Sequence, residues 1–145
     1  MSIRKVVYLD FDGVLHPTRL AIESAFCRVH LLEPLFDNNS VSIVISSSWR
    51  FTHKLSALQA KLPSSLAQCV IGVTGDAVIG KHARYQEIIK HAKELEHGSL
   101  WCALDDSYWE FPSTCKELIR CNPNTGISSK EIAVLSTWLS SSQVT

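Results

Sequence analysis

Short apolar runs alternate along this chain with longer segments whose apolar residues recur at helical spacing. The apolar runs lie at 6–9, 41–45, 69–73 and 100–104, with a weaker one at 117–121. Because the first run is continuous rather than alternating, it predicts a strand covered on both faces, as in a parallel sheet. Alternating strands and helices indicate an α/β fold, a three-layer parallel sheet of about five strands flanked by helices.

The segments between these runs are expected to be mainly helical. Proline and glycine mark several of their ends, and a capping-box pattern marks the start of the last one. The expected helices are 20–36, bent before Pro34; 52–61, stopping before Pro63; 82–97, stopped by Gly98; and a final amphipathic helix capped by Ser128 and Glu131.

Composition limits the class of protein. With 145 residues, 46% of them hydrophobic, the chain is expected to form a single domain over residues 1–145. Its 14 basic and 14 acidic residues balance, so no global field attracts nucleic acid or an anionic membrane. No apolar stretch approaches the ~20 residues of a membrane span. The five cysteines are odd in number and lack CxxC spacing, which indicates reduced thiols and a cytoplasmic protein.

Polar residues follow three of the predicted strands where each one ends. They are Asp10 and Asp12 after the first, Ser46 to Ser48 after the second, and Asp105 with Asp106 after the fourth. Parallel strands present their carboxyl ends at one edge of a sheet, where ligands bind. Two acids as close as Asp10 and Asp12 repel each other and call for a cation. Carboxylates from two strands suit Mg²⁺, which makes phosphoryl chemistry the leading candidate.

The stretch DFDGVL, from Asp10 to Leu15, resembles the first motif, DxDGxL, of the haloacid dehalogenase-like (HAD) superfamily. The later features follow in the family's order: a serine after the second run, a basic residue at a helix start, and an aspartate pair. This similarity spans about residues 5–106. It implies a Rossmann-like sheet, and the short insert between the first two motifs leaves no room for a large cap domain.

The resemblance also implies a role for each matching residue. Asp10 would be the nucleophile that takes the phosphoryl group, through an aspartyl-phosphate. Asp12 would protonate the leaving oxygen and then activate water, and an acid at this position favours a phosphatase or phosphotransferase over a dehalogenase. Ser46 would hydrogen-bond a phosphoryl oxygen. Mg²⁺ would be held by the Asp10 carboxylate, the Asp12 backbone carbonyl and Asp105 or Asp106.

The basic residue of the third motif has two candidates, Lys81 and Arg84. Arg84 is favoured because it opens an amphipathic helix at a spacing from Asp105 that suits the HAD superfamily, and because arginine contacts phosphate in a bidentate manner. Lys81 remains the alternative and a candidate substrate-binding residue.

Four further residues near these motifs are candidates for binding the substrate, and each has a structural alternative. His16 either lines the pocket or lies on a surface loop. Ser47 either contacts phosphate or caps the following helix. Trp49 is either a base-stacking platform or a core residue, and Arg50 either binds substrate or forms a structural ion pair.

Five segments narrow this resemblance: 9–17, SSSWR at 46–50, Arg84 with Glu87 and Ile88, WCALDD at 101–106, and NPNTGI at 122–127. Together they resemble the HAD domain subgroup of "Swiss army knife" RNA repair proteins. The resemblance implies a phosphorylated substrate such as an RNA or DNA end or a nucleotide. Two alternatives stay open: a small-metabolite phosphatase or phosphotransferase, and a non-catalytic phosphate-binding module. Retention of both Asp10 and Asp12 argues against the last, since binding alone needs no general acid.

Overall fold

The centre of the fold is a sheet of five parallel strands in the order β3-β2-β1-β4-β5. A computed structural model describes residues 4–19, 25–37 and 40–141. The strands are β1 Lys5–Leu9, β2 Val41–Ile45, β3 Val70–Val73, β4 Leu100–Asp105 and β5 Leu118–Arg120. The α-helices are α1 Glu33–Asp37, α2 Leu55–Ala60, α3 Ser64–Ala67, α4 Ala83–Ala92 and α5 Ser129–Ser140. Short 3-10 helices are η1 Val29–Leu31, η2 Ser48–Phe51 and η3 Tyr108–Glu110.

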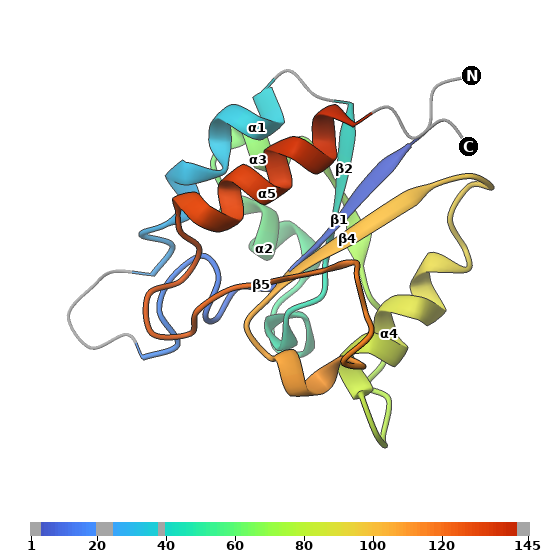
Figure 1. Ribbon diagram of the computed structural model, residues 1–145. Helices are drawn as coiled ribbons and strands as arrows, with labels where there is room; N and C mark the ends of the chain where they lie inside the picture. The colour runs from blue at the N-terminus through green and yellow to red at the C-terminus, as the bar shows by residue number, and fades with distance from the viewer. Residues whose placement is uncertain (1–3, 20–24, 38–39, 142–145) are drawn as a thin grey trace.

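Helices cover both faces of this sheet, which confirms the predicted three-layer α/β arrangement without a cap domain. Helices α1, α3 and α5 lie on one face and α4 lies on the other (Figure 1). The side chains of β1 alternate between the layers: Val7 and Leu9 pack in the larger core cluster, whereas Tyr8 packs with Ile88 of α4. Strand β1 is therefore buried on both faces, as its continuous apolar run predicts.

The long helix expected over 20–36 is wrong where the structure describes it. Residues 25–28 form a turn, followed by η1 and the short helix α1. Phe26 has a positive φ of 65°, which a helix does not allow. Pro34 lies in the first turn of α1, where its missing N–H leaves no hydrogen bond unmade. Residues 20–24 of the expected helix lie outside the described residues.

Two other expected helices are shorter in the structure than predicted, and one helix was not predicted. Helix α2 begins at Leu55 rather than at residue 52, because η2 and a turn precede it. Helix α4 stops at Ala92, and the chain continues in tight turns in which the Glu94 and Leu95 amides donate to carbonyls three residues back. After Pro63 the chain forms α3, which the sequence pattern did not indicate. The capping box of α5 is confirmed, because the Ser128 N–H donates to Glu131 Oε1 over 2.9 Å.

The described helices include none that is long and apolar enough to cross a membrane. None of the five cysteines, all of which lie in the described residues, forms a disulfide, and Cys102 and Cys121 are buried.

Candidate active site

Three polar residues lie side by side at the carboxyl edge of the sheet because the strand ladders continue one residue past β1. The Asp10 N–H donates to the Leu104 carbonyl over 3.1 Å, and the Ser46 N–H donates to the Leu9 carbonyl over 3.0 Å. Leu9 is in register with both Leu104 and Ile45. The next residue on each strand therefore meets the others, which places Asp10 between Ser46 and Asp105.

The carboxylates of Asp10, Asp105 and Asp106 form a buried cluster. One oxygen from each lies within 4.8 Å of the others. All three residues are at most 7% exposed. Oxygen ligands of this kind are those that Mg²⁺ prefers, so these side chains fit a divalent cation.

Gly13 allows this close packing. It has a φ of +77°, and a Cβ at this position would collide with the Asp106 carboxylate. The glycine of the first motif is thus required both by its backbone conformation and by the approach of the third acid.

Arg84, from the first turn of α4, is the cation next to this cluster. Its Nη1 lies 2.6 Å from Asp105 Oδ2 and 3.4 Å from Asp10 Oδ1. Lys81, the alternative, is exposed in the turn before α4 and makes no ion pair or hydrogen bond with any described residue. Of the two basic candidates, only Arg84 is brought to the acids.

Burial and mutual repulsion perturb the titration of this cluster. Burial, followed by the charge of Asp105, raises the pKa of Asp10 well above its usual value, and Arg84 only partly opposes this. Burial also raises the pKa of Asp105. For Arg84, burial acts to lower the pKa, but the neighbouring carboxylates outweigh it and the pKa rises. Without a further cation the cluster holds more negative charge than one arginine offsets.

Asp12 lies apart from the cluster, and its side chain is held by two N–H donors. His16 Nε2 lies 2.8 Å from Asp12 Oδ1, and Trp49 Nε1 donates to Asp12 Oδ2 over 3.0 Å. The Asp12 side chain is 43% exposed, so it can reach both solvent and a ligand.

His16 is fully buried rather than on a surface loop. Its Nδ1 accepts a hydrogen bond from the Phe26 N–H over 3.1 Å, which leaves the ring proton on Nε2, facing Asp12. The ring packs edge-on against Phe26 and tilted against Trp49. His16 and Trp49 therefore position Asp12. The His53 ring stacks on Trp49 at an interplanar angle of 21°, which favours the packing alternative for Trp49 over a base-stacking platform.

Ser46 presents an unused hydroxyl to the site. The residue is fully buried, and its Oγ has no hydrogen-bond partner. An unpaired buried hydroxyl is costly unless a ligand completes it. Thr74, at the tip of β3, also carries a buried Oγ1 without a partner, and its neighbouring sequence carries no motif that would have indicated it.

Ser47 and Arg50 have structural contacts. The Ser47 hydroxyl accepts from the Trp49 N–H and caps η2. Arg50 donates through Nη1 to the Ser46 and Ser47 carbonyls and through Nη2 to Glu87 Oε1, over 2.8 Å, and its side chain is 3% exposed. Its donors are engaged within the protein, so the structure favours the ion-pair alternative. Glu87 lies one helical turn after Arg84, in a segment that matches the family, but the sequence did not predict it as a site residue.

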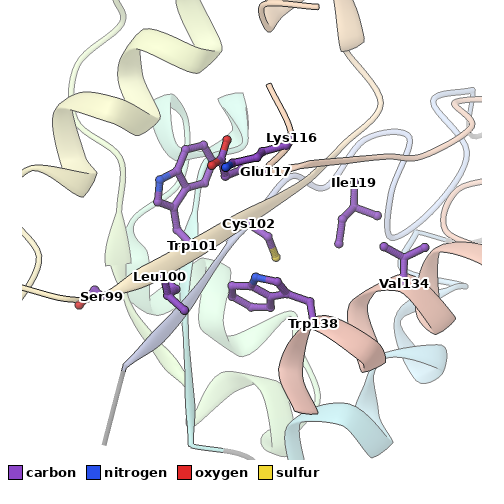
Figure 2. Close-up of a pocket in the computed structure, with 9 residues that line it drawn as sticks. All are labelled: Ser99, Leu100, Trp101, Cys102, Lys116, Glu117, Ile119, Val134 and Trp138. Carbon is purple, nitrogen blue, oxygen red and sulfur yellow. The ribbon is translucent and has the colours of Figure 1, made fainter. Parts of the chain in front are cut away.

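A separate pocket of about 510 Å³ lies toward the opposite end of β4, away from these residues (Figure 2). Trp138 of α5 extends across it toward Cys102 of β4, and Val134 lines it beside Ile119. None of the candidate site residues lines this pocket.

Comparison of the sequence with known proteins identifies a family whose model covers the residues at the strand tips. The model of a family described as "HAD domain in Swiss Army Knife RNA repair proteins" matches residues 6–132. No curated protein and no solved structure matches the chain. The matched region contains both acids of the first motif, Ser46, Arg84 and the Asp105–Asp106 pair. The chain belongs to this family of HAD domains.

Proposed function

We propose that this protein is a Mg²⁺-dependent phosphatase that hydrolyses a phosphomonoester through an aspartyl-phosphate at Asp10. The observation that carries the proposal is the division of labour between the two acids of the first motif. Asp10 lies in the buried carboxylate cluster beside Arg84, whereas Asp12 lies outside it in a partly exposed position. Nucleophilic attack and proton transfer need two carboxyl groups in such different surroundings.

The first chemical step forms the covalent intermediate. A carboxylate oxygen of Asp10 attacks phosphorus, and the bond from phosphorus to the leaving oxygen breaks. Asp12 gives its proton to that oxygen, so the leaving group departs as a neutral alcohol. In the second step water attacks the phosphorus of the aspartyl-phosphate, Asp12 takes the proton, and the Asp10 carboxylate is restored with release of phosphate.

The carboxylates of Asp10, Asp105 and Asp106, with the Asp12 backbone carbonyl, would hold Mg²⁺, which supplies positive charge against the repulsion between nucleophile and phosphate. Arg84 adds a fixed positive charge 3.4 Å from Asp10 Oδ1. The free Ser46 hydroxyl donates to a phosphoryl oxygen, which completes the hydrogen bonding of a group that is otherwise unpaired.

The proposed substrate is a phosphate on a nucleic-acid end or a nucleotide. Two features support this class: the family's description as a domain of RNA repair proteins, and the absence of a cap domain above the sheet edge among the residues that the structure describes. An uncapped edge leaves space for the rest of a polymer beyond its terminal phosphate, whereas an enclosed site would exclude it. A panel of sugar phosphates, mononucleotides and end-phosphorylated oligonucleotides tests the assignment, and preference for sugar phosphates would contradict it.

Hydrolysis of an aryl phosphate tests the enzymatic proposal itself. Wild-type protein should release phosphate with Mg²⁺ and lose this activity in EDTA. Asp10→Asn should be inactive, whereas Asp37→Asn, which alters an exposed acid at the end of α1, before the amino end of β2, should match wild type. If wild type and Asp10→Asn are equally inactive across the substrate panel, the protein is a phosphate-binding module rather than an enzyme.

A further inference from the structure

A second pocket, of about 380 Å³, opens directly beside the carboxylate cluster. It lies among the loops that follow β1, β4 and β5, and Asp106 of the cluster forms part of its wall. Arg19, Trp109 and Asn124 line it as well. The loops are tied together at this point, because the Thr18 N–H donates to the Pro123 carbonyl over 2.8 Å. Its volume is in the range that holds a small organic ligand.

Trp109, which lines this pocket, and its neighbour Tyr108 are both large exposed aromatic residues. Trp109 is 61% exposed and Tyr108 is 49% exposed. Both belong to η3, which begins three residues after Asp105. Within the described part of the chain, the Trp109 indole N–H and the Tyr108 hydroxyl have no hydrogen-bond partner. Exposed aromatic surface next to a reaction centre indicates a binding surface.

The aromatic pair is held in place by Arg120 of β5. Its guanidinium lies 3.6 Å from the centre of the Tyr108 ring. The Tyr108 ring in turn meets Trp109 edge-on, with ring centres 5.4 Å apart and an interplanar angle of 82°. These contacts orient the indole without covering both of its faces, which leaves a flat surface available for stacking.

A neighbouring depression continues from this pocket with a basic lining. The two share Pro123 and Asn124, and Arg120 and Lys130 line the second. Its acidic residue, Glu131, is engaged by the Ser128 N–H and hydroxyl in the capping box. The continuous path from Asp106 therefore presents an aromatic surface first and positive charge further out.

We propose that this path binds the terminal nucleotides of a single-stranded nucleic acid whose end phosphate is the substrate. The base of the terminal nucleotide stacks on Trp109, and Arg120 and Lys130 contact the phosphodiester backbone of the adjoining nucleotides. The inference rests on the proposed phosphatase function and names its substrate more closely: a strand of several nucleotides rather than a free phosphate ester.

Binding to a catalytically inactive protein tests this proposal independently of turnover. The probe is a fluorescent single-stranded oligonucleotide phosphorylated at one end, prepared as RNA and as DNA and with the phosphate at either end. Its anisotropy is measured with Asp10→Asn and with the same protein carrying Trp109→Ala. The second substitution should weaken binding roughly tenfold, the loss expected for one base-aromatic stack. An unchanged dissociation constant overturns the proposal.

Two control variants separate stacking from general surface effects. Phe51→Ala removes an aromatic side chain that is 52% exposed on η2, on the other side of β1, and should leave binding unchanged. The double substitution Arg120→Ala and Lys130→Ala should reduce the dependence of binding on salt concentration. If Phe51→Ala weakens binding as much as Trp109→Ala does, the base lies elsewhere and the proposal fails.

Turnover distinguishes failure of the subsite from failure of the phosphatase function. In otherwise wild-type protein, Trp109→Ala should lower the ratio of kcat/KM for the oligonucleotide to kcat/KM for an aryl phosphate, roughly tenfold. An unaltered ratio refutes the subsite while hydrolysis stands. Absence of aryl phosphate hydrolysis in wild type refutes the phosphatase function, whatever the binding data show.

Discussion

Replacing Trp49 with phenylalanine should weaken proton transfer from Asp12 while leaving nucleophilic attack by Asp10 in place. The substitution removes one donor, the indole Nε1, that holds Asp12 Oδ2 at 3.0 Å. The second donor, His16 Nε2, remains on the other oxygen at 2.8 Å. A phenyl ring preserves much of the packing of residue 49 against Phe11 and Phe26.

The size of the effect follows from the kind of hydrogen bond that is lost. A bond to a charged group contributes about 1.5–3 kcal/mol. Because the Asp12 side chain is 43% exposed, a hydrogen bond from water partly replaces the lost one, and the lower end of that range applies. About 1.5 kcal/mol corresponds to roughly a tenfold loss in kcat/KM for a substrate whose leaving group needs the proton.

Two aryl phosphates with different leaving groups separate this effect from general damage. Phenyl phosphate, with a poor leaving group, should lose roughly tenfold, whereas dinitrophenyl phosphate, whose leaving group departs as an anion, should change by less than about twofold. Trp101→Phe alters an indole in β4, away from the site, and should leave both rates unchanged. Equal losses on both substrates would refute the role assigned to Trp49.

Three further predictions concern stability and metal binding. Burial and Asp105 raise the pKa of Asp10. The contribution of Asp10 to the free energy of unfolding is therefore fully present below about pH 4 and is lost as the pH rises through the raised pKa. Asp10→Asn should therefore stabilise metal-free protein at neutral pH by about 1–2 kcal/mol, measured by urea unfolding in EDTA, and a destabilised variant would contradict this. Gly13→Ala should lower stability by about 1–2 kcal/mol and weaken Mg²⁺ binding measured by calorimetry, because the new Cβ meets the Asp106 carboxylate. Gly72→Ala is the control, because a Cβ at that position meets no atom within 4 Å. Equal Mg²⁺ affinity in the two variants would count against the site. Arg50→Met should cost about 3–5 kcal/mol in urea unfolding, since it leaves the buried Glu87 carboxylate without its ion-pair partner, with only the Val78 N–H as a donor. A loss below about 1 kcal/mol would show that the pair is not structural.

The meeting of Asp10, Ser46 and Asp105 was predictable because it depends on short-range rules. Each residue directly follows or ends an apolar strand, and parallel strands share their carboxyl edge. The register of β1 with β2 and β4 then places the three residues side by side. The capping box of α5 was predictable for the same reason, because both of its partners lie within one turn.

The contacts of His16 and Arg50 were not predictable because their partners are distant in sequence. His16 is oriented by the backbone N–H of Phe26, in a turn where the apolar spacing predicted a helix. Arg50 is engaged by Glu87, which lies 37 residues away. The exposure of Trp109 likewise depends on how three loops come together, and composition alone assigns a tryptophan to the core as readily as to a surface.

Detection of a phosphorylated Asp10 tests the central claim most directly. The Asp12→Asn variant is mixed with dinitrophenyl phosphate and Mg²⁺. The leaving group of this substrate needs no general acid in the first step, but the variant lacks the base for the second step, so the phosphorylated protein should accumulate. After acid quenching, mass spectrometry of peptides should show a hydroxylamine-sensitive phosphate on Asp10, and the additional substitution Asp10→Asn should abolish it. Release of dinitrophenol that continues undiminished in the double variant, with no phosphate on the protein, would contradict Asp10 as the nucleophile.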